Sequence, residues 1–122
     1  MAAMLLWLNA KGRMMVNKYR NIRAGLFDSK KEMKRFKQLE SLEKQGLIKD
    51  LRRQVRYDLL PSQYIDGRCV ERGVKYFADF VYITADGQTI VEDVKSPVSR
   101  TKDYIIKRKL MLHIHGIRIA EI

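Results

Sequence analysis

The sequence predicts a small mixed α/β domain with the element order α-β-β-β-α-β. Three observations predict it: a capped helical pattern from residue 29, alternating strand-like segments between residues 51 and 95, and a helical segment followed by a short apolar strand at the end. A length of 122 residues fits one domain. The final β-α-β crossover should be right-handed and place the last strand parallel to the third. We therefore expect a small mixed sheet flanked by two helices.

Residues 1–27 predict a flexible basic arm in front of a folded domain over residues 28–122. The arm has no acidic residue, and Gly12 and Gly25 interrupt any regular pattern. Met14 and Met15 leave open whether residues 1–14 belong to the native protein. The basic residues of the arm are Lys11, Arg13, Lys18, Arg20 and Arg23.

The first predicted helix begins at Ser29 and ends at Gly46. Ser29 and Glu32 have the spacing of a capping box, and apolar residues follow at helical intervals. The segment LRRQVRYDLL then alternates like a strand up to Pro61, and residues 61–73 are polar and predict a loop. A second helix over residues 100–114 should end at Gly116, before the short strand IRIA.

Two strands are predicted at about 74–84 and 89–95, around Asp86-Gly87. A two-residue turn would send Asp79 and Asp93 to opposite faces of the sheet. A three-residue loop over residues 85–87, with a left-handed glycine in a bulge, sets the two aspartates opposite each other. This second register also gathers apolar residues on one face, so we prefer it; these are Phe77, Val81, Ile83 and Val91.

In this register Asp79, Asp93 and Lys95 form a candidate catalytic site. Opposed carboxylates on adjacent strands have Cβ atoms about 4.5–5.5 Å apart, and their mutual repulsion favours a bound cation. Mg²⁺ suits such a pair because it accepts one or two carboxylates and keeps waters that a phosphate can displace; Mn²⁺ is the expected substitute. Lys95 would stabilise charge that develops on the phosphate or orient the attacking water. The simpler alternative is a solvated Asp–Lys pair on a strand.

Glu32 is a candidate third carboxylate. It lies on the same side of the first helix as Phe36 and Leu39, so we expect it to face the core. Its other possible role is to complete the capping box only.

The formal net charge of +11 predicts a polyanionic partner, for which nucleic acid is favoured over a membrane surface. The apolar stretch near the N-terminus is too short to span a bilayer, and the single cysteine, Cys69, favours a reducing cytoplasmic setting. We expect basic side chains to contact DNA phosphates from the arm and from both helices. These candidates are Lys18, Arg20, Lys31, Lys34, Arg100, Lys102, Lys107 and Arg108.

The segments FADFVY and VEDVKS, with NKYRNIRAGLFDSKKEMKRFKQLE before them, resemble a small phage-encoded family assigned to the PD-(D/E)XK nuclease superfamily. The resemblance covers about residues 17–122. It implies metal ligands at Asp79 and Asp93, the superfamily lysine at Lys95 and the accessory helix acid at Glu32. Ala78 stands where the signature has proline.

The resemblance further implies Mg²⁺-dependent hydrolysis of DNA, with branched DNA as the substrate and a homodimer as the active form, as in small Holliday-junction resolvases. A phage-encoded member would work in the host cytoplasm, in recombination or replication. Two other interpretations stay open: a non-catalytic DNA-binding protein on the same fold, and a nuclease that acts on RNA.

Overall fold

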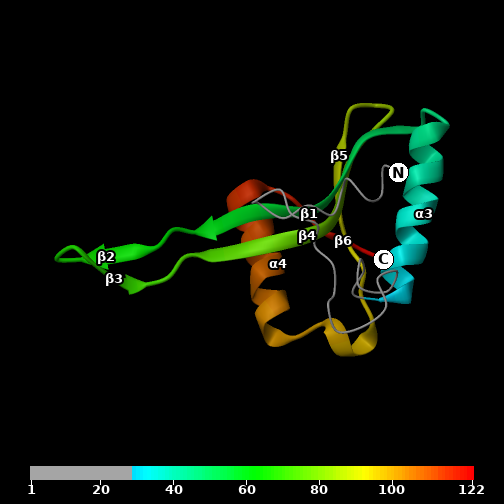
Figure 1. Ribbon diagram of the computed structural model, residues 1–122. Helices are drawn as coiled ribbons and strands as arrows, with labels where there is room; N and C mark the ends of the chain where they lie inside the picture. The colour runs from blue at the N-terminus through cyan, green and yellow to red at the C-terminus, as the bar shows by residue number, and fades with distance from the viewer. Residues whose placement is uncertain (1–28) are drawn as a thin grey trace, which may run out of the picture. The chain divides into compact units, whose positions relative to one another are not determined.

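The structure, a computed structural model, describes residues 29–122, and the predicted basic arm with Lys18 and Arg20 lies outside the described residues. It confirms the predicted fold class, a mixed α/β protein with a small mixed sheet and two helices (Figure 1). The four-stranded sheet has the order β1-β4-β5-β6, and β2 and β3 form a separate two-stranded ladder. The elements are α3 (Lys30–Lys44), β1 (Ile48–Leu60), β2 (Gln63–Ile65), β3 (Arg68–Glu71), β4 (Val74–Thr84), β5 (Thr89–Asp93), the 3₁₀ turn η1 (Pro97–Ser99), α4 (Lys102–His115) and β6 (Ala120–Glu121).

The chain divides into two compact units: the first runs up to Arg53 and includes Tyr82–Thr89, and the second comprises Gln54–Val81 and Ile90–Ile122. Neither helix within residues 29–122 is long and apolar enough to cross a membrane.

In the first unit, α3 begins and ends where the sequence predicts. The Ser29 hydroxyl accepts a hydrogen bond from the Glu32 amide at 3.1 Å. Gly46, just past the helix, has a φ of +78°, a left-handed conformation that glycine adopts without steric cost. The apolar side of the helix is buried, with Phe36 1% and Leu39 0% exposed.

The loop between β4 and β5 confirms the three-residue register. The Thr84 amide donates to the Gln88 carbonyl at 2.8 Å, and the Gly87 amide donates back to the Thr84 carbonyl at 2.9 Å. Gly87 has a φ of +88°, as the bulge of such a loop requires. The two-residue alternative is therefore excluded.

The core of the second unit lies between α4 and the strands. Tyr104 and Met111 of α4 join Tyr76 and Ala78 of β4 and Val91 of β5 in one buried cluster. The helix stops at the left-handed Gly116, as predicted, and starts after the Thr101 cap, slightly later than the predicted residue 100.

The last strand is parallel to β5, as the predicted crossover requires. Glu92 pairs with Ala120, and Asp93 pairs with Glu121. This pairing brings the carboxyl end of β5, which carries Asp93, next to the C-terminal strand.

The prediction of a loop over residues 61–73 is wrong. This segment contains the antiparallel pair β2–β3, which continues the β1–β4 hairpin outward (Figure 1). Ile65 pairs with Arg68, and the two residues between them, Asp66 and Gly67, both have positive φ, as in a tight hairpin turn. All of β2 and β3 is exposed, including Cys69.

The prediction that Phe77 shares a buried face with Val81 and Val91 is also wrong. Phe77 is 52% exposed, whereas Val81 and Val91 lie in the core cluster with Tyr76 and Ala78. Strict alternation would send positions 78 and 81 to opposite faces, so the alternation of β4 breaks between them. Asp79 lies within this irregular stretch.

Candidate active site

The Asp79 carboxylate accepts two hydrogen bonds in the second unit. Gln54 of β1 donates its side-chain amide to Oδ1 at 3.1 Å. The backbone amide of Val94 donates to Oδ2 at 2.8 Å. Val94 is the first residue after β5, so the Asp79 side chain takes the place of a strand partner there. These two bonds fix the orientation of the carboxylate.

Burial, and next to it the negative charge of Asp93, raise the pKa of the Asp79 carboxyl to about 6, against the hydrogen bonds from Val94 and Gln54, which lower it. Asp79 and Asp93 therefore interact, as the register predicts. The pair concentrates negative charge in a place where water solvates it poorly.

Asp93 is 6% exposed and has a donor on each oxygen. The Tyr76 hydroxyl donates to Oδ2 at 2.6 Å, and the Lys95 ammonium lies 3.0 Å from Oδ1. The Lys95 ammonium also lies 3.6 Å from the centre of the Tyr104 ring, a cation–π distance. The structure thus brings together Asp79, Asp93 and Lys95, the three residues that the sequence predicts at the centre of the site.

Two tyrosines shape the site, and sequence reasoning did not assign them a role there. Burial and the neighbouring Asp93 carboxylate both raise the pKa of Tyr76, which keeps its hydroxyl a donor. Burial likewise raises the pKa of Tyr104, whose hydroxyl donates to Glu121 at 2.7 Å. A tyrosine in a predicted strand or helix is usually interpreted as a core residue. The one feature of the sequence that could have indicated a role in the site is that Tyr76 lies three positions before Asp79.

Glu121 of β6 anchors the far side of this network. The pKa of the Glu121 carboxyl is lowered to about 2. The hydrogen bond from the Tyr104 hydroxyl is the largest cause, and those from Arg100 and Arg108 follow. Arg100 and Arg108 contact its two oxygens at 2.9 and 3.0 Å. Both arginines were predicted to contact DNA, and Glu121 neutralises part of their charge.

Glu32 lies in the first unit and is 2% exposed, which confirms that it faces the core. The Glu32 carboxylate lies 3.7 Å from the guanidinium of Arg53, whose side chain is fully buried. The same guanidinium lies over the Phe36 ring, 4.8 Å from its centre. Within residues 29–122 no group of three or more His, Cys, Asp or Glu side chains is arranged to hold a metal ion. A metal-binding role for Glu32 stays a prediction, next to its role in the buried ion pair.

The other predicted DNA contacts within the described residues lie on the helix surfaces. Lys31 and Lys34 of α3 and Lys102 of α4 are exposed, and Lys107 is partly exposed. Their positions leave the ammonium groups accessible to a polyanion.

The fold and the site together define a class: a small mixed α/β protein with two interacting carboxylates on adjacent strands and a lysine just past the end of the second strand. The sequence matches the family described as Protein of unknown function (DUF1064) over residues 9–119, so the chain belongs to that family. A comparison with the curated proteins found no match.

Proposed function

We propose that the protein is a Mg²⁺-dependent nuclease that hydrolyses phosphodiester bonds in DNA, as its resemblance to the PD-(D/E)XK superfamily implies. The observation that carries the proposal is the 3.0 Å contact between Lys95 and Asp93, beside the perturbed carboxyl of Asp79. Ordinary surface ion pairs are exposed to water. Here the side chains of Lys95 and Asp93 are only 10% and 9% exposed, and buried charge at this cost is typical of functional sites.

The residues present fit a Mg²⁺ ion. The four carboxylate oxygens of Asp79 and Asp93 each contact a protein donor, and the two side chains also lie within hydrogen-bonding reach of each other. A carboxylate oxygen offers two lone pairs, so the pair can accept a cation in place of the contact between the two carboxyls. A divalent cation would also offset the charge that raises the Asp79 pKa. Mg²⁺ commonly binds one or two carboxylates and completes its shell with water and phosphate, and Mn²⁺ accepts the same oxygen ligands.

The bound cation would polarise the phosphate and lower the pKa of an attacking water. Asp79 and Asp93 would hold the cation, with their orientations fixed by Gln54, the Val94 amide and Tyr76. Lys95 would stabilise the negative charge that develops on the phosphate as the water oxygen bonds to phosphorus and the bond from phosphorus to the leaving sugar oxygen breaks. The water gives its proton to solvent, and the leaving oxygen takes one from solvent.

The substrate that the resemblance favours is branched DNA, and the active form a homodimer. A junction has two strands to cut, which two symmetry-related sites can reach at once. The net charge of +11 supports a polyanionic substrate.

The test is incubation with linear, nicked, flapped and four-way DNA plus Mg²⁺, with Asp93→Asn and Asp79→Asn as controls. We expect wild type to cleave at least the branched DNA. Each variant should lose cleavage and keep DNA binding, because loss of a carboxylate removes the metal site and also lowers repulsion of phosphate. Wild-type binding without cleavage of any substrate would identify a non-catalytic DNA-binding protein, and cleavage confined to matched RNA substrates would move the proposal to RNA.

A further inference from the structure

The outer face of the β1–β4 hairpin, opposite the core of the second unit, combines cations with an exposed aromatic ring. Val74 and Tyr76 pack on the core cluster, so Lys75 and Phe77 point to the other face. On β1, Val55 and Tyr57 pack on the same cluster, which sends Arg56 to the outer face. Lys75 and Arg56 are exposed, and Phe77 is 52% exposed.

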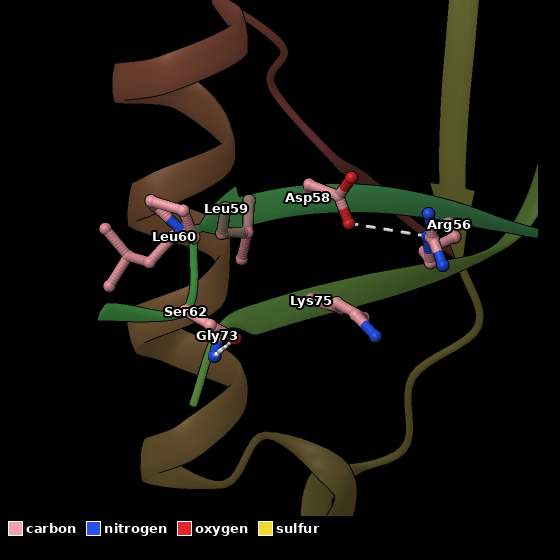
Figure 2. A pocket seen from close by; sticks show the side chains of 8 residues that line it. Arg56, Asp58, Leu59, Leu60, Ser62, Gly73 and Lys75 are labelled. Atoms are coloured by element: carbon pink, nitrogen blue, oxygen red, sulfur yellow. Dashed lines mark hydrogen bonds and ion pairs between the residues drawn. The ribbon is translucent and has the colours of Figure 1, made fainter. Parts of the chain in front are cut away.

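This face is hollowed beside its two cations. A hollow of about 380 Å³ lies between β1 and β4, and Figure 2 shows Arg56 and Lys75 on its two strands. At the edge of the hollow, Gly73 lets the two backbones approach closely, because a Cβ there would meet the Leu60 carbonyl oxygen at 2.7 Å. Its lining residues are Arg56, Asp58, Leu59, Leu60, Pro61, Ser62, Gly73 and Lys75.

The two cations are available to a ligand. The Lys75 side chain makes no hydrogen bond or ion pair with any of residues 29–122. Arg56 pairs with Asp58 at 3.4 Å, but both side chains are more than half exposed, and such pairs contribute little. A second hollow adjoins the first at Gly73 and Lys75 and is also lined by Lys107 of α4. Asp103 also lines this second hollow, so Lys75 and Lys107 lie there beside one carboxylate.

We propose that Arg56, Lys75 and Phe77 form a binding face for a single DNA strand, with Phe77 stacking on an unpaired base and the two cations on phosphates. Cations beside an exposed ring on a strand surface are the combination that binds single strands without sequence preference. A second copy of this protein is disfavoured as the occupant because the same cations would repel each other.

Phe77 and Lys75 share β4 with Asp79 but lie on the face away from Tyr76, which contacts Asp93. Along the strand, Phe77 precedes Asp79 by two residues, about 7 Å, and Lys75 precedes it by four, about 13 Å. The inference deepens the proposed function and rests on it in one respect: the substrate of the active site would be DNA that contains an unpaired segment, such as a flap or an open branch.

The experiment measures binding of a labelled oligothymidine by fluorescence anisotropy in EDTA, where cleavage cannot occur. Phe77→Leu should weaken binding about fivefold or more, whereas Phe77→Tyr, which keeps an aromatic ring, should bind like wild type. Lys75→Ala should also reduce the slope of log affinity against log salt by about 0.7, the value for one phosphate contact on a single strand.

Lys49→Ala removes an exposed lysine elsewhere on β1 and is the matched charge control, for which we expect a smaller loss than for Lys75→Ala. Equal binding by Phe77→Leu and wild type, or equal losses for Lys75→Ala and Lys49→Ala, would overturn the inference. The experiment measures binding and not cleavage. The binding result can therefore be interpreted even if the protein has no nuclease activity.

Discussion

Lys95 is held from two directions, by the Asp93 carboxylate at 3.0 Å and by the face of the Tyr104 ring at 3.6 Å. A long, flexible side chain is thereby confined to one position. Such preorganisation matters in catalysis, because a donor already in place needs no reorganisation when charge develops on the substrate. A lysine that served only solubility would need neither contact.

Lys95→Ala should therefore lower the rate of cleavage by on the order of 10²–10³ while the Mg²⁺ concentration for half-maximal rate changes little. Single-turnover cleavage across a Mg²⁺ titration measures both quantities on one substrate. A near-normal rate at saturating Mg²⁺ would make Lys95 a structural residue.

Asp79 has an unfavourable environment in the metal-free protein, since its pKa of about 6 lies above the ordinary value of 3.8. The folded state binds this proton more tightly than the unfolded state, so its contribution opposes folding increasingly as the pH rises from about 4 through 6. Asn keeps one acceptor oxygen for the two donors, Gln54 and the Val94 amide, so the prediction concerns the difference between two pH values. The effect of Asp79→Asn on the free energy of unfolding of the metal-free protein should be more favourable at pH 7 than at pH 4 by about 1–2 kcal/mol. Thermal unfolding in EDTA at the two pH values checks this; an equal effect at both would point to a cause other than ionisation.

At the scale of the elements, the sequence predicts what local chemistry fixes. Each of the correctly predicted features depends on residues that lie only a few positions apart in the sequence. These features are the cap at Ser29, the helix ends at Gly46 and Gly116, and the loop with Gly87. The β2–β3 hairpin was missed although Asp66-Gly67 is a hairpin signal, because the polar residues around it resemble a loop.

The parts of the site that depend on distant residues were not predictable in the same way. Gln54 reaches Asp79 across 25 positions, and Glu121 reaches Tyr104 across 17. The break of alternation in β4, which exposes Phe77, has no signal in its run of apolar residues. The register of β4 and β5 did place Asp79, Asp93 and Lys95 correctly, because one short loop determines it.

Glu121 ties β6 to α4, and its lowered pKa makes this link pH-dependent. A carboxyl with a depressed folded pKa stabilises above its unfolded value near 4.5 and loses that contribution as the pH falls toward 2. Glu121→Gln should lower the free energy of unfolding by about 1–2 kcal/mol at pH 7, allowing for the exposed arginine partners. Urea unfolding at pH 7 and pH 3 should show the gap between wild type and variant narrowing; a constant gap would exclude the ionised carboxyl as its source.

At the scale of the whole molecule, 25 basic and 14 acidic residues leave a strong excess of positive charge. The basic residues are not equally available to bind a polyanion. Arg100 and Arg108 share the Glu121 carboxylate, whereas the Lys107 side chain pairs with none of the residues that the structure describes. Affinity for DNA should accordingly depend on particular cations more than on their number.

Duplex DNA binding should weaken steeply as salt rises, and Lys107→Ala should reduce the slope of log affinity against log salt by about 0.9. Arg108→Ala should reduce it by less, because Glu121 neutralises part of that charge. Anisotropy titrations at several salt concentrations give both slopes. If the two variants change the slope equally, Glu121 does not moderate the arginine.

The hairpin of β2 and β3 also carries a site at which a spectroscopic label can be attached. Cys69 is exposed on β3 and is the sole thiol of the whole sequence. A maleimide dye or a nitroxide spin label would therefore attach at one defined position without any engineered cysteine. Two labelled copies would report their separation by dipolar coupling, so the same thiol can show directly whether, and how closely, two hairpins meet when protein binds a four-way junction.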